Sequence, residues 1–128
     1  APLDFTFSKK FNGKIPSELE KLTVVLIATP KIASEVRKYA PESIIVGFKA
    51  EYGVSINEMI ERAYKRLVEH QLDLIVANDV SRLDIGFGAD YNEVYVIDKN
   101  KNVIHIPKMS KREVAREIIR LALKLNKE

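Results

Sequence analysis

The residues best suited to chemistry in this sequence are cations and hydroxyls that could hold an anion. Thr29, Lys31 and Ser34 surround the predicted start of a helix, where free backbone N–H groups and the helix dipole favour negative charge. Arg62, Arg66 and His70 are spaced by four, so they share one face of a second predicted helix, and Arg66 and His70 could hold phosphates. Capped helices and solvated helix faces show the same patterns, so an anion site and a structural role both stay open.

Other site chemistries find little support in the residues. The 128 residues contain no Cys, which excludes disulfides, thiolate zinc sites and a cysteine nucleophile within this chain. Neither a GxGxxG fingerprint nor a GxxxxGK[ST] loop is present. The two His residues lack the spaced partners of a zinc site, and His105 falls in a predicted hairpin, so we assign it no catalytic role. Lys9, Lys10 and Lys14 flank Gly13 in a loop that could fold over an anion or simply be a surface segment.

The elements that must position these residues alternate between apolar strands and amphipathic helices. Capping boxes at Ser55–Glu58 and Ser110–Glu113 mark two helix starts. We expect strands at 22–28, 43–48 and 73–77, helices at 30–39, 56–70 and from 111, and a hairpin at 93–97 and 102–106. The order predicts an α/β fold with a mostly parallel Rossmann-like sheet flanked by helices, followed by a C-terminal β-hairpin and helix.

This topology predicts where a ligand binds before any family is considered. Ligands of open parallel sheets bind at the carboxyl ends of the strands. Those ends are expected at 28–29, 47–48 and 77–78. The helix start at 29–34 and the edge of the predicted sheet would therefore form one site.

Length and charge describe an ordinary globular domain. The chain has 128 residues, 46% hydrophobic and 30% charged, so we expect one domain over 1–128. The net charge of +3 is uneven, with the excess in residues 99–128, where a stripe of cations recurs every four residues: Arg112, Arg116, Arg120 and Lys124. We interpret that stripe as the solvated face of a helix and expect no nucleic-acid partner. No apolar run is long enough for a membrane span, and no signal peptide is visible.

Several segments together carry a family resemblance. They are Ala-Pro-Leu-Asp-Phe at 1–5, Gly-Lys-Ile at 13–15, Thr-Pro-Lys-Ile at 29–32, Val-Gly-Phe-Lys-Ala-Glu at 46–51 and Leu-Asp-Leu-Ile-Val-Ala-Asn-Asp-Val at 72–80. Over nearly all its length the chain resembles the C-terminal portion of phosphopantothenoylcysteine synthetase. The pair of segments at 46–51 and 77–80, separated by a helix, is the most specific part of the match.

The resemblance implies a ligase of coenzyme A biosynthesis. In that family CTP, or ATP in eukaryotic members, activates the carboxylate of 4′-phosphopantothenate, and pyrophosphate leaves. The amine of cysteine then attacks the acyl-nucleotide to give an amide and CMP. The resemblance further implies Mg2+ with the triphosphate, a homodimer and a cytoplasmic location.

The resemblance also implies site residues, position by position. Lys14 aligns with the first lysine of a Lys-x-Lys-Lys flap over the acyl-nucleotide and is the implied catalytic residue, although Pro16 and Ser17 replace the other two lysines. The implied nucleotide-binding residues are Asp4, Lys31, Ile32, Ala33, Ser34, Phe48, Arg66 and His70. Many family members have Asp at the position of Lys31, and the family has lysines where Arg66 and His70 stand. The resemblance implies no metal ligands.

The family carries further elements that this sequence lacks. A glycine-bearing strand–helix start and an asparagine that meets the reacting acyl group both lie upstream of Asp4, as does any flavin-binding decarboxylase half. With no initiator Met, we interpret the chain as the C-terminal part of a larger ligase domain. We expect it to bind no FMN and not to ligate alone. Two alternatives are a standalone nucleotide- or phosphate-binding module and a dimerisation domain.

Overall fold

The computed structural model describes residues 3–10, 12–29 and 31–125. Contacts between residues divide the chain into two units, with the boundary between Ile32 and Ala33. The prediction of a single domain over 1–128 stays a prediction.

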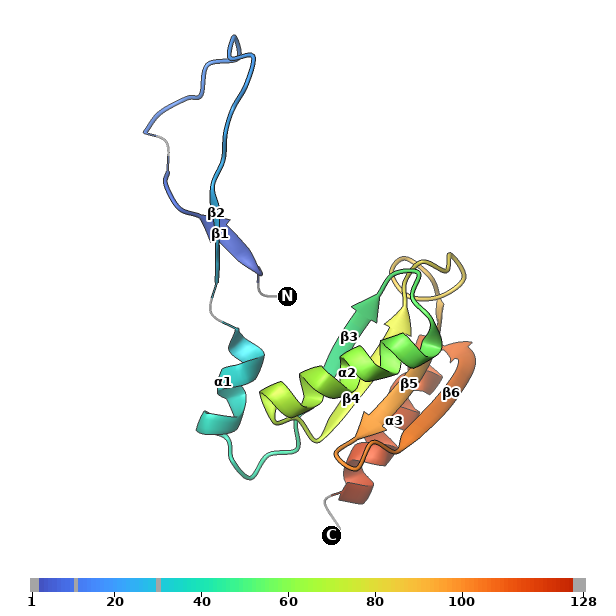
Figure 1. Cartoon of the computed structure of the whole chain (residues 1–128). Helices are drawn as coiled ribbons and strands as arrows, with labels where there is room; N and C mark the ends of the chain where they lie inside the picture. The colour runs from blue at the N-terminus through green and yellow to red at the C-terminus, as the bar shows by residue number, and fades with distance from the viewer. Residues whose placement is uncertain (1–2, 11, 30, 126–128) are drawn as a thin grey trace. The chain divides into compact units, whose positions relative to one another are not determined.

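The first unit is a two-stranded antiparallel ribbon. Strand β1 (Phe5–Phe7) pairs with β2 (Leu26–Ala28), with Phe5 opposite Ala28 and Phe7 opposite Leu26. Two further backbone hydrogen bonds extend the pairing, from Ser8 N to Val25 O (3.1 Å) and from Thr29 N to Asp4 O (3.0 Å). The described residues between the strands, 8–10 and 12–25, lie in turns and loops (Figure 1).

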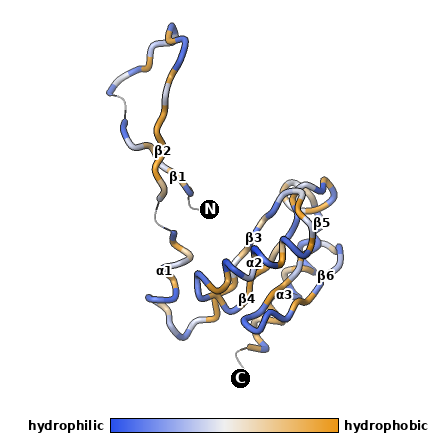
Figure 2. Tube along the Cα trace, in the orientation of Figure 1, coloured by the Kyte–Doolittle hydropathy of each residue, from blue (hydrophilic) through white to orange (hydrophobic). Residues whose placement is uncertain are grey.

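The prediction of a doubly covered strand at 22–28 is wrong. Only its last three residues form a strand, in the ribbon and not in the parallel sheet. Leu22, Val24, Val25, Leu26 and Ile27 are between 46% and 61% exposed, and Figure 2 shows this hydrophobic stretch along the ribbon. β-branched residues favour extended backbone, but they do not select the strand with which it pairs. Here the partner is the short alternating segment Phe5–Phe7.

The second unit contains the four-stranded sheet. Along the chain its elements are α1 (Ile32–Tyr39), β3 (Val46–Glu51), α2 (Ile56–His70), β4 (Leu74–Asp79), β5 (Tyr91–Asp98), β6 (Val103–Ser110) and α3 (Lys111–Leu125). The strand order is β3-β4-β5-β6. The β3–β4 pair is parallel, whereas β4–β5 and β5–β6 are antiparallel.

The predicted α/β class, the flanking helices and the C-terminal hairpin and helix are confirmed. Within the four-stranded sheet the strand directions are mixed, with one parallel pairing and two antiparallel ones. The reason is that the β5–β6 hairpin pairs with the edge of β4 opposite β3, while β2 pairs with β1 and not with the sheet. Among the helices that the structure describes, none is long and apolar enough to cross a bilayer.

Each face of this sheet is covered by one long helix (Figure 1). Side chains alternate along a strand, so neighbouring strand residues enter different cores. On one face Met59, Ala63 and Leu67 of α2 pack with Ile75 and Ile97. On the other face Val114 of α3 packs in a second buried cluster, with Leu74, Val76, Val94, Val96 and Ile106. Within β3, Val46 packs against the cluster that contains Val114.

Both predicted capping boxes are confirmed. Glu58 N donates to Ser55 Oγ at 3.2 Å, and α2 begins at Ile56. Glu113 N donates to Ser110 Oγ at 3.2 Å, while the Ser110 hydroxyl donates to the Glu113 carboxylate at 2.9 Å. The predicted solvated stripe of α3 is exposed at all four cations: Arg112, Arg116, Arg120 and Lys124.

Candidate functional site

Within the second unit, the Arg37 guanidinium joins α1 to the end of α2. Arg37 donates to the backbone carbonyls of Gln71 (2.9 and 3.0 Å), Pro41 (3.0 Å) and Ser43 (2.8 Å), and to the Asp73 carboxylate (2.7 Å). Gln71 ends α2 in the left-handed conformation with φ of 55°, which turns its carbonyl toward this guanidinium. The fork geometry of Arg suits such convergent acceptors. Arg37 therefore sets where α1 lies beside the end of α2.

The carboxyl ends of β3 and β4 lie side by side, two or three residues later than the sequence predicts. The parallel register pairs Val46 with Leu74 and Glu51 with Asp79. Val80 N donates to Glu51 O at 2.8 Å. The Asp79 carboxylate accepts from Gly53 N (3.1 Å) and Ser81 N (2.9 Å).

The turns beyond this edge are held by the Asp79 carboxylate. Hydrogen bonds from the Ser81 side chain and from the backbone N–H groups of Gly53 and Ser81 keep the pKa of Asp79 below its ordinary value. The charged form accepts these bonds best, so the carboxylate acts as a fixed acceptor that ties the two turns together.

Farther along, Arg82 donates to Asp84 (2.8 Å) and pairs with Glu93. His105 lies 2.7 Å from Glu93 and stacks on Tyr95. These contacts join the loop after β4 to the β5–β6 hairpin.

A charged cavity lies between β3 and α2. Its volume is about 330 Å³, and its lining consists of four cations and two carboxylates: Lys49, Arg62, Lys65, Arg66, Glu51 and Glu69. This is the lower end of the size range of small-molecule sites, roughly 300–1,000 Å³. Of the residues that the resemblance implies, Arg66 belongs to this cavity.

An apolar hollow lies on the opposite face of β3, against α3. Its volume is about 340 Å³. Phe48 lines it and is 72% exposed, so the ring is open to a planar ligand. The other lining residues come from β5 and α3: Asn92, Val94, Lys111, Val114, Ala115, Ile118 and Ile119.

The predicted nucleotide residues of the second unit therefore do not share one wall. Phe48 faces α3, whereas Arg66 faces the charged cavity under α2. His70 lies one helical turn beyond Arg66, at the last residue of α2, and is partly buried. Ala33 and Ser34 lie in the first turn of α1. A ligand that contacts both Phe48 and Arg66 must pass around β3, the edge strand.

In the first unit, two of the implied residues form an ion pair. Lys31 Nζ lies 3.0 Å from Asp4 Oδ1, and both side chains are largely exposed. Lys14 is exposed in the loop between β1 and β2, and Ile32 is 58% exposed at the first residue of α1. The charges of Lys31 and Asp4 therefore compensate each other.

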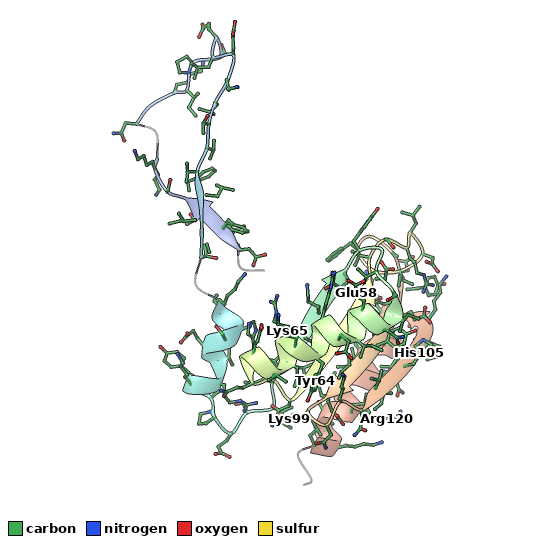
Figure 3. The ribbon with its side chains drawn as sticks, in the orientation of Figure 1. Glu58, Tyr64, Lys65, Lys99, His105 and Arg120 are labelled. Atoms are coloured by element: carbon green, nitrogen blue, oxygen red, sulfur yellow. The ribbon has the colours of Figure 1, made fainter. Side chains whose placement is uncertain are left out.

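Sequence reasoning missed Lys49, Glu51 and Lys65. Figure 3 shows Lys65 and Tyr64 projecting from opposite sides of α2. A signal was present, because Lys49 and Glu51 are charged residues two apart in a strand that otherwise reads as apolar, so they share a face. The pairing of Glu51 with Arg62 of α2 could not be predicted without knowing which helix covers that face.

Within the described residues no group of three or more His, Asp or Glu side chains could hold a metal ion. Magnesium is commonly held by substrate phosphates, a few waters and only one or two carboxylates.

An α/β unit with a charged cavity on one face of its edge strand and an exposed aromatic ring on the other is suited to anionic, ring-bearing ligands. Residues 1–125 match the model of one family, described as the DNA/pantothenate metabolism flavoprotein C-terminal domain. The chain belongs to this family. The resemblance drawn from its motifs is thereby confirmed.

Relatives and solved structures agree with this assignment. The chain is 40% identical over 124 residues to the coenzyme A biosynthesis bifunctional protein CoaBC of Methanocaldococcus jannaschii, covering 97% of this chain and 29% of that protein. It is 37% identical over 128 residues to the CoaBC protein of Bacillus subtilis, covering 100% and 30%. The crystal structure of the DNA/pantothenate metabolism flavoprotein from Streptococcus pneumoniae superposes with a TM-score of 0.74 at 30% identity, covering 88% of this chain and 46% of that one.

Proposed function

We propose that this chain is part of a ligase that joins 4′-phosphopantothenate to cysteine in coenzyme A biosynthesis. The observation that carries the proposal is the family match over residues 1–125, together with curated relatives named as bifunctional coenzyme A biosynthesis proteins. The chain spans about 30% of the length of those relatives, so the proposal gives it a share of the catalytic machinery rather than all of it.

The proposed reaction proceeds through an acyl-nucleotide. A carboxylate oxygen of 4′-phosphopantothenate attacks the α-phosphorus of CTP, and pyrophosphate leaves. The amine of cysteine then attacks the acyl carbon, which forms the amide and releases CMP. Both steps bring anions together, so the protein must supply positive charge where the phosphates lie. CTP is the proposed nucleotide, ATP the alternative, and Mg2+ would accompany either.

The chain's residues suit these tasks in different ways. Phe48 offers an exposed ring on which a base could stack. Arg66 and the other cations of the charged cavity supply positive charge, and the start of α1 at Ala33 and Ser34 supplies backbone N–H groups. We assign Lys14 the flap role and Asp4, Lys31, Ile32 and His70 nucleotide contacts, on the strength of the resemblance.

Pyrophosphate release tests the proposal. The assay contains CTP or ATP, 4′-phosphopantothenate, cysteine and Mg2+, with either this chain or a protein that joins it to the remaining sequence found in its relatives. We expect turnover by the longer protein, faster with CTP, and none by the 128-residue chain. Robust turnover by the chain alone would contradict its partial role, and an inactive, folded longer protein would contradict the ligase assignment.

Two alternatives rest on particular features. The charged cavity supports a nucleotide- or phosphate-binding module without catalysis. The exposed apolar residues of the ribbon support a dimerisation role, and we propose a homodimer in either case. Calorimetry with CTP tests the first alternative, because a catalysis-free module binds CTP while the longer protein shows no turnover. Light scattering tests the second, because a dimerisation domain has the mass of a dimer in solution. A cytoplasmic location is proposed as well, which cell fractionation checks.

A further inference from the structure

Helix α1 has almost no apolar packing to hold it in place. None of its residues is buried, and an eight-residue helix is too short to be stable by itself in water. Among the described residues, the two buried clusters and the half-buried side chains packed against them include no residue of α1. The position of α1 within the second unit therefore depends on polar contacts.

Arg37 supplies such contacts with every N–H donor of its guanidinium. Nε and Nη2 both donate to Gln71 O, and Nη1 donates to Pro41 O and to Ser43 O. The remaining donor, on Nη2, bonds to the Asp73 carboxylate, and the Arg37 side chain is only 17% exposed. Because these bonds use all the donors that a guanidinium has, Arg37 has none left for a substrate and acts through the groups that it positions.

The bonds to Gln71 stabilise an unusual backbone conformation at the end of α2. Gln71 has φ of 55° and ψ of 45°, in the left-handed region that residues with a Cβ rarely adopt. Its N–H donates back to Val68 O at 3.3 Å, and its carbonyl accepts from Arg37. The residue before it, His70, is the last of α2. Arg37 therefore fixes the backbone directly after His70.

Asp73, the acidic partner of Arg37, is itself held from two other sides. Its carboxylate accepts a hydrogen bond from Ile45 N (2.8 Å) and pairs with Lys99 (2.8 Å), and its side chain is 15% exposed. Hydrogen bonds to a carboxylate favour its charged form, which is the form that Arg37 needs. The acceptor is thus held in place by elements other than α1.

The two helices that Arg37 joins carry residues of the proposed nucleotide site. Ala33 and Ser34 lie in the first turn of α1, and Arg66 and His70 lie in the last two turns of α2. We propose that Arg37 is a positioning residue for nucleotide binding, because it keeps α1 docked at the C-terminal end of α2, so that both helices present their contacts together. The nucleotide part of this proposal rests on the proposed function. Neither the sequence motifs nor the resemblance assigns a role to Arg37.

Hydrogen exchange in the 128-residue chain tests whether Arg37 docks α1. In Arg37→Gln we expect the backbone amides of residues 36–40 to exchange about tenfold faster, the factor for loss of one charged hydrogen bond. The amides of α3 and of the interior of α2 should keep their rates, because the core does not include α1. Mass spectrometry of peptides measures both. Unchanged exchange in α1 overturns the proposal.

Lys38→Gln is the matched control, because it removes the same charge from the same helix. Lys38 pairs with Glu35 at 3.2 Å, and both side chains are exposed, so the pair contributes little. We expect the α1 amides of this variant to exchange as in the natural sequence. Equal acceleration in Lys38→Gln and Arg37→Gln overturns the role of Arg37.

A second variant keeps the test decisive if Arg37→Gln does not fold. Arg37→Lys then replaces it, since an ammonium keeps the charge near Asp73 but lacks the fork that reaches three carbonyls as well. The α1 amides should again exchange faster than in the natural sequence. A folded Arg37→Lys chain with unchanged α1 exchange overturns the proposal.

The ligase assay gives a readout that a loss of stability alone would not produce. With α1 undocked, nucleotide binding must also order the helix, which weakens binding. For Arg37→Gln in the longer protein we expect the KM for CTP to rise about tenfold with kcat within about twofold, and for Lys38→Gln neither should change. An unchanged KM, or a fall in kcat alone, in a folded Arg37→Gln protein overturns the positioning role.

These outcomes are separate from those of the proposed function. A longer protein without turnover contradicts the ligase assignment, and the Kd of CTP for the 128-residue chain, measured by calorimetry, then replaces KM as the readout. In that case about tenfold weaker CTP binding by Arg37→Gln supports the positioning role, and equal or absent CTP binding overturns it. Turnover with a KM that Arg37→Gln does not change overturns the positioning role and leaves the ligase assignment intact.

Discussion

At the scale of single residues, half-buried charged side chains join elements that are distant in the sequence. Asp73 accepts hydrogen bonds from Arg37 (2.7 Å) and Ile45 N (2.8 Å), and Lys99 lies 2.8 Å away. Burial raises the pKa of Asp73, but hydrogen bonds from Lys99, the Ile45 backbone and Arg37 outweigh it, so the pKa lies below its ordinary value of 3.8. One carboxylate thus joins α1, β3 and the β5–β6 hairpin.

Asp73→Asn tests this junction. Because the pKa of Asp73 is lowered on folding, its contribution is present above the unfolded value and is lost as pH falls through the folded one. We expect the variant to lose about 1–3 kcal/mol of unfolding free energy at pH 7, the range for a partly buried charged hydrogen bond. Urea denaturation at pH 7 and pH 3 measures the difference.

The difference in unfolding free energy between the Asp73→Asn variant and the natural sequence should become smaller toward pH 3. Glu35→Gln is the control, since Glu35 forms an exposed pair with Lys38 and should cost less than about 0.5 kcal/mol. A gap of the same size at both pH values would contradict the assigned role of the carboxylate.

At the scale of elements, local sequence signals located the helices better than the strands. The two capping boxes fix the starts of α2 and α3 to the residue. The strand predictions are displaced, since β3 runs from Val46 to Glu51 and not from 43 to 48. A cap is a contact within four residues, whereas the end of a strand depends on the register of a distant partner. The same reason explains why Leu22–Ala28 was assigned to the wrong sheet.

The caps carry a prediction at this scale. Ser55→Ala and Ser110→Ala each remove the acceptor of the third N–H of a helix and should lower unfolding free energy by about 1 kcal/mol. Urea denaturation checks the effect. Ser17→Ala, at an exposed position before β2, should change it by only a few tenths. Equal effects at all three positions would show that the caps do not account for the helix starts.

At the scale of the whole molecule, the buried core belongs to the second unit. Every fully buried apolar residue among the described ones lies between Met59 and Val114, and the residues of the ribbon strands are exposed. The ribbon therefore adds little to the free energy of folding of the rest. Its apolar surface is available for contacts with another part of a larger protein or with a second copy, which is the basis of the proposed homodimer.

Removal of residues 1–32 tests the independence of the second unit. We expect the shortened chain to fold, with unfolding free energy within about 1 kcal/mol of the 128-residue chain, because what it loses is the first residue of α1 and no core contact. Circular dichroism and urea denaturation measure this. A shortened chain that is unfolded would show that the ribbon contributes to the core after all.

The sequence by itself determined the α/β class, the helix starts, the C-terminal hairpin and the family, because each depends on local periodicity or on motif identity. It could also place Arg66 and His70 on one helix face, since helical spacing is fixed. Tertiary structure alone decided which strands pair, that Phe48 and Arg66 line cavities on opposite faces of β3, and that Glu51 pairs with both Lys49 and Arg62 in the charged cavity. Those features depend on which distant element covers each face of a strand, and alternation along the chain does not specify that partner.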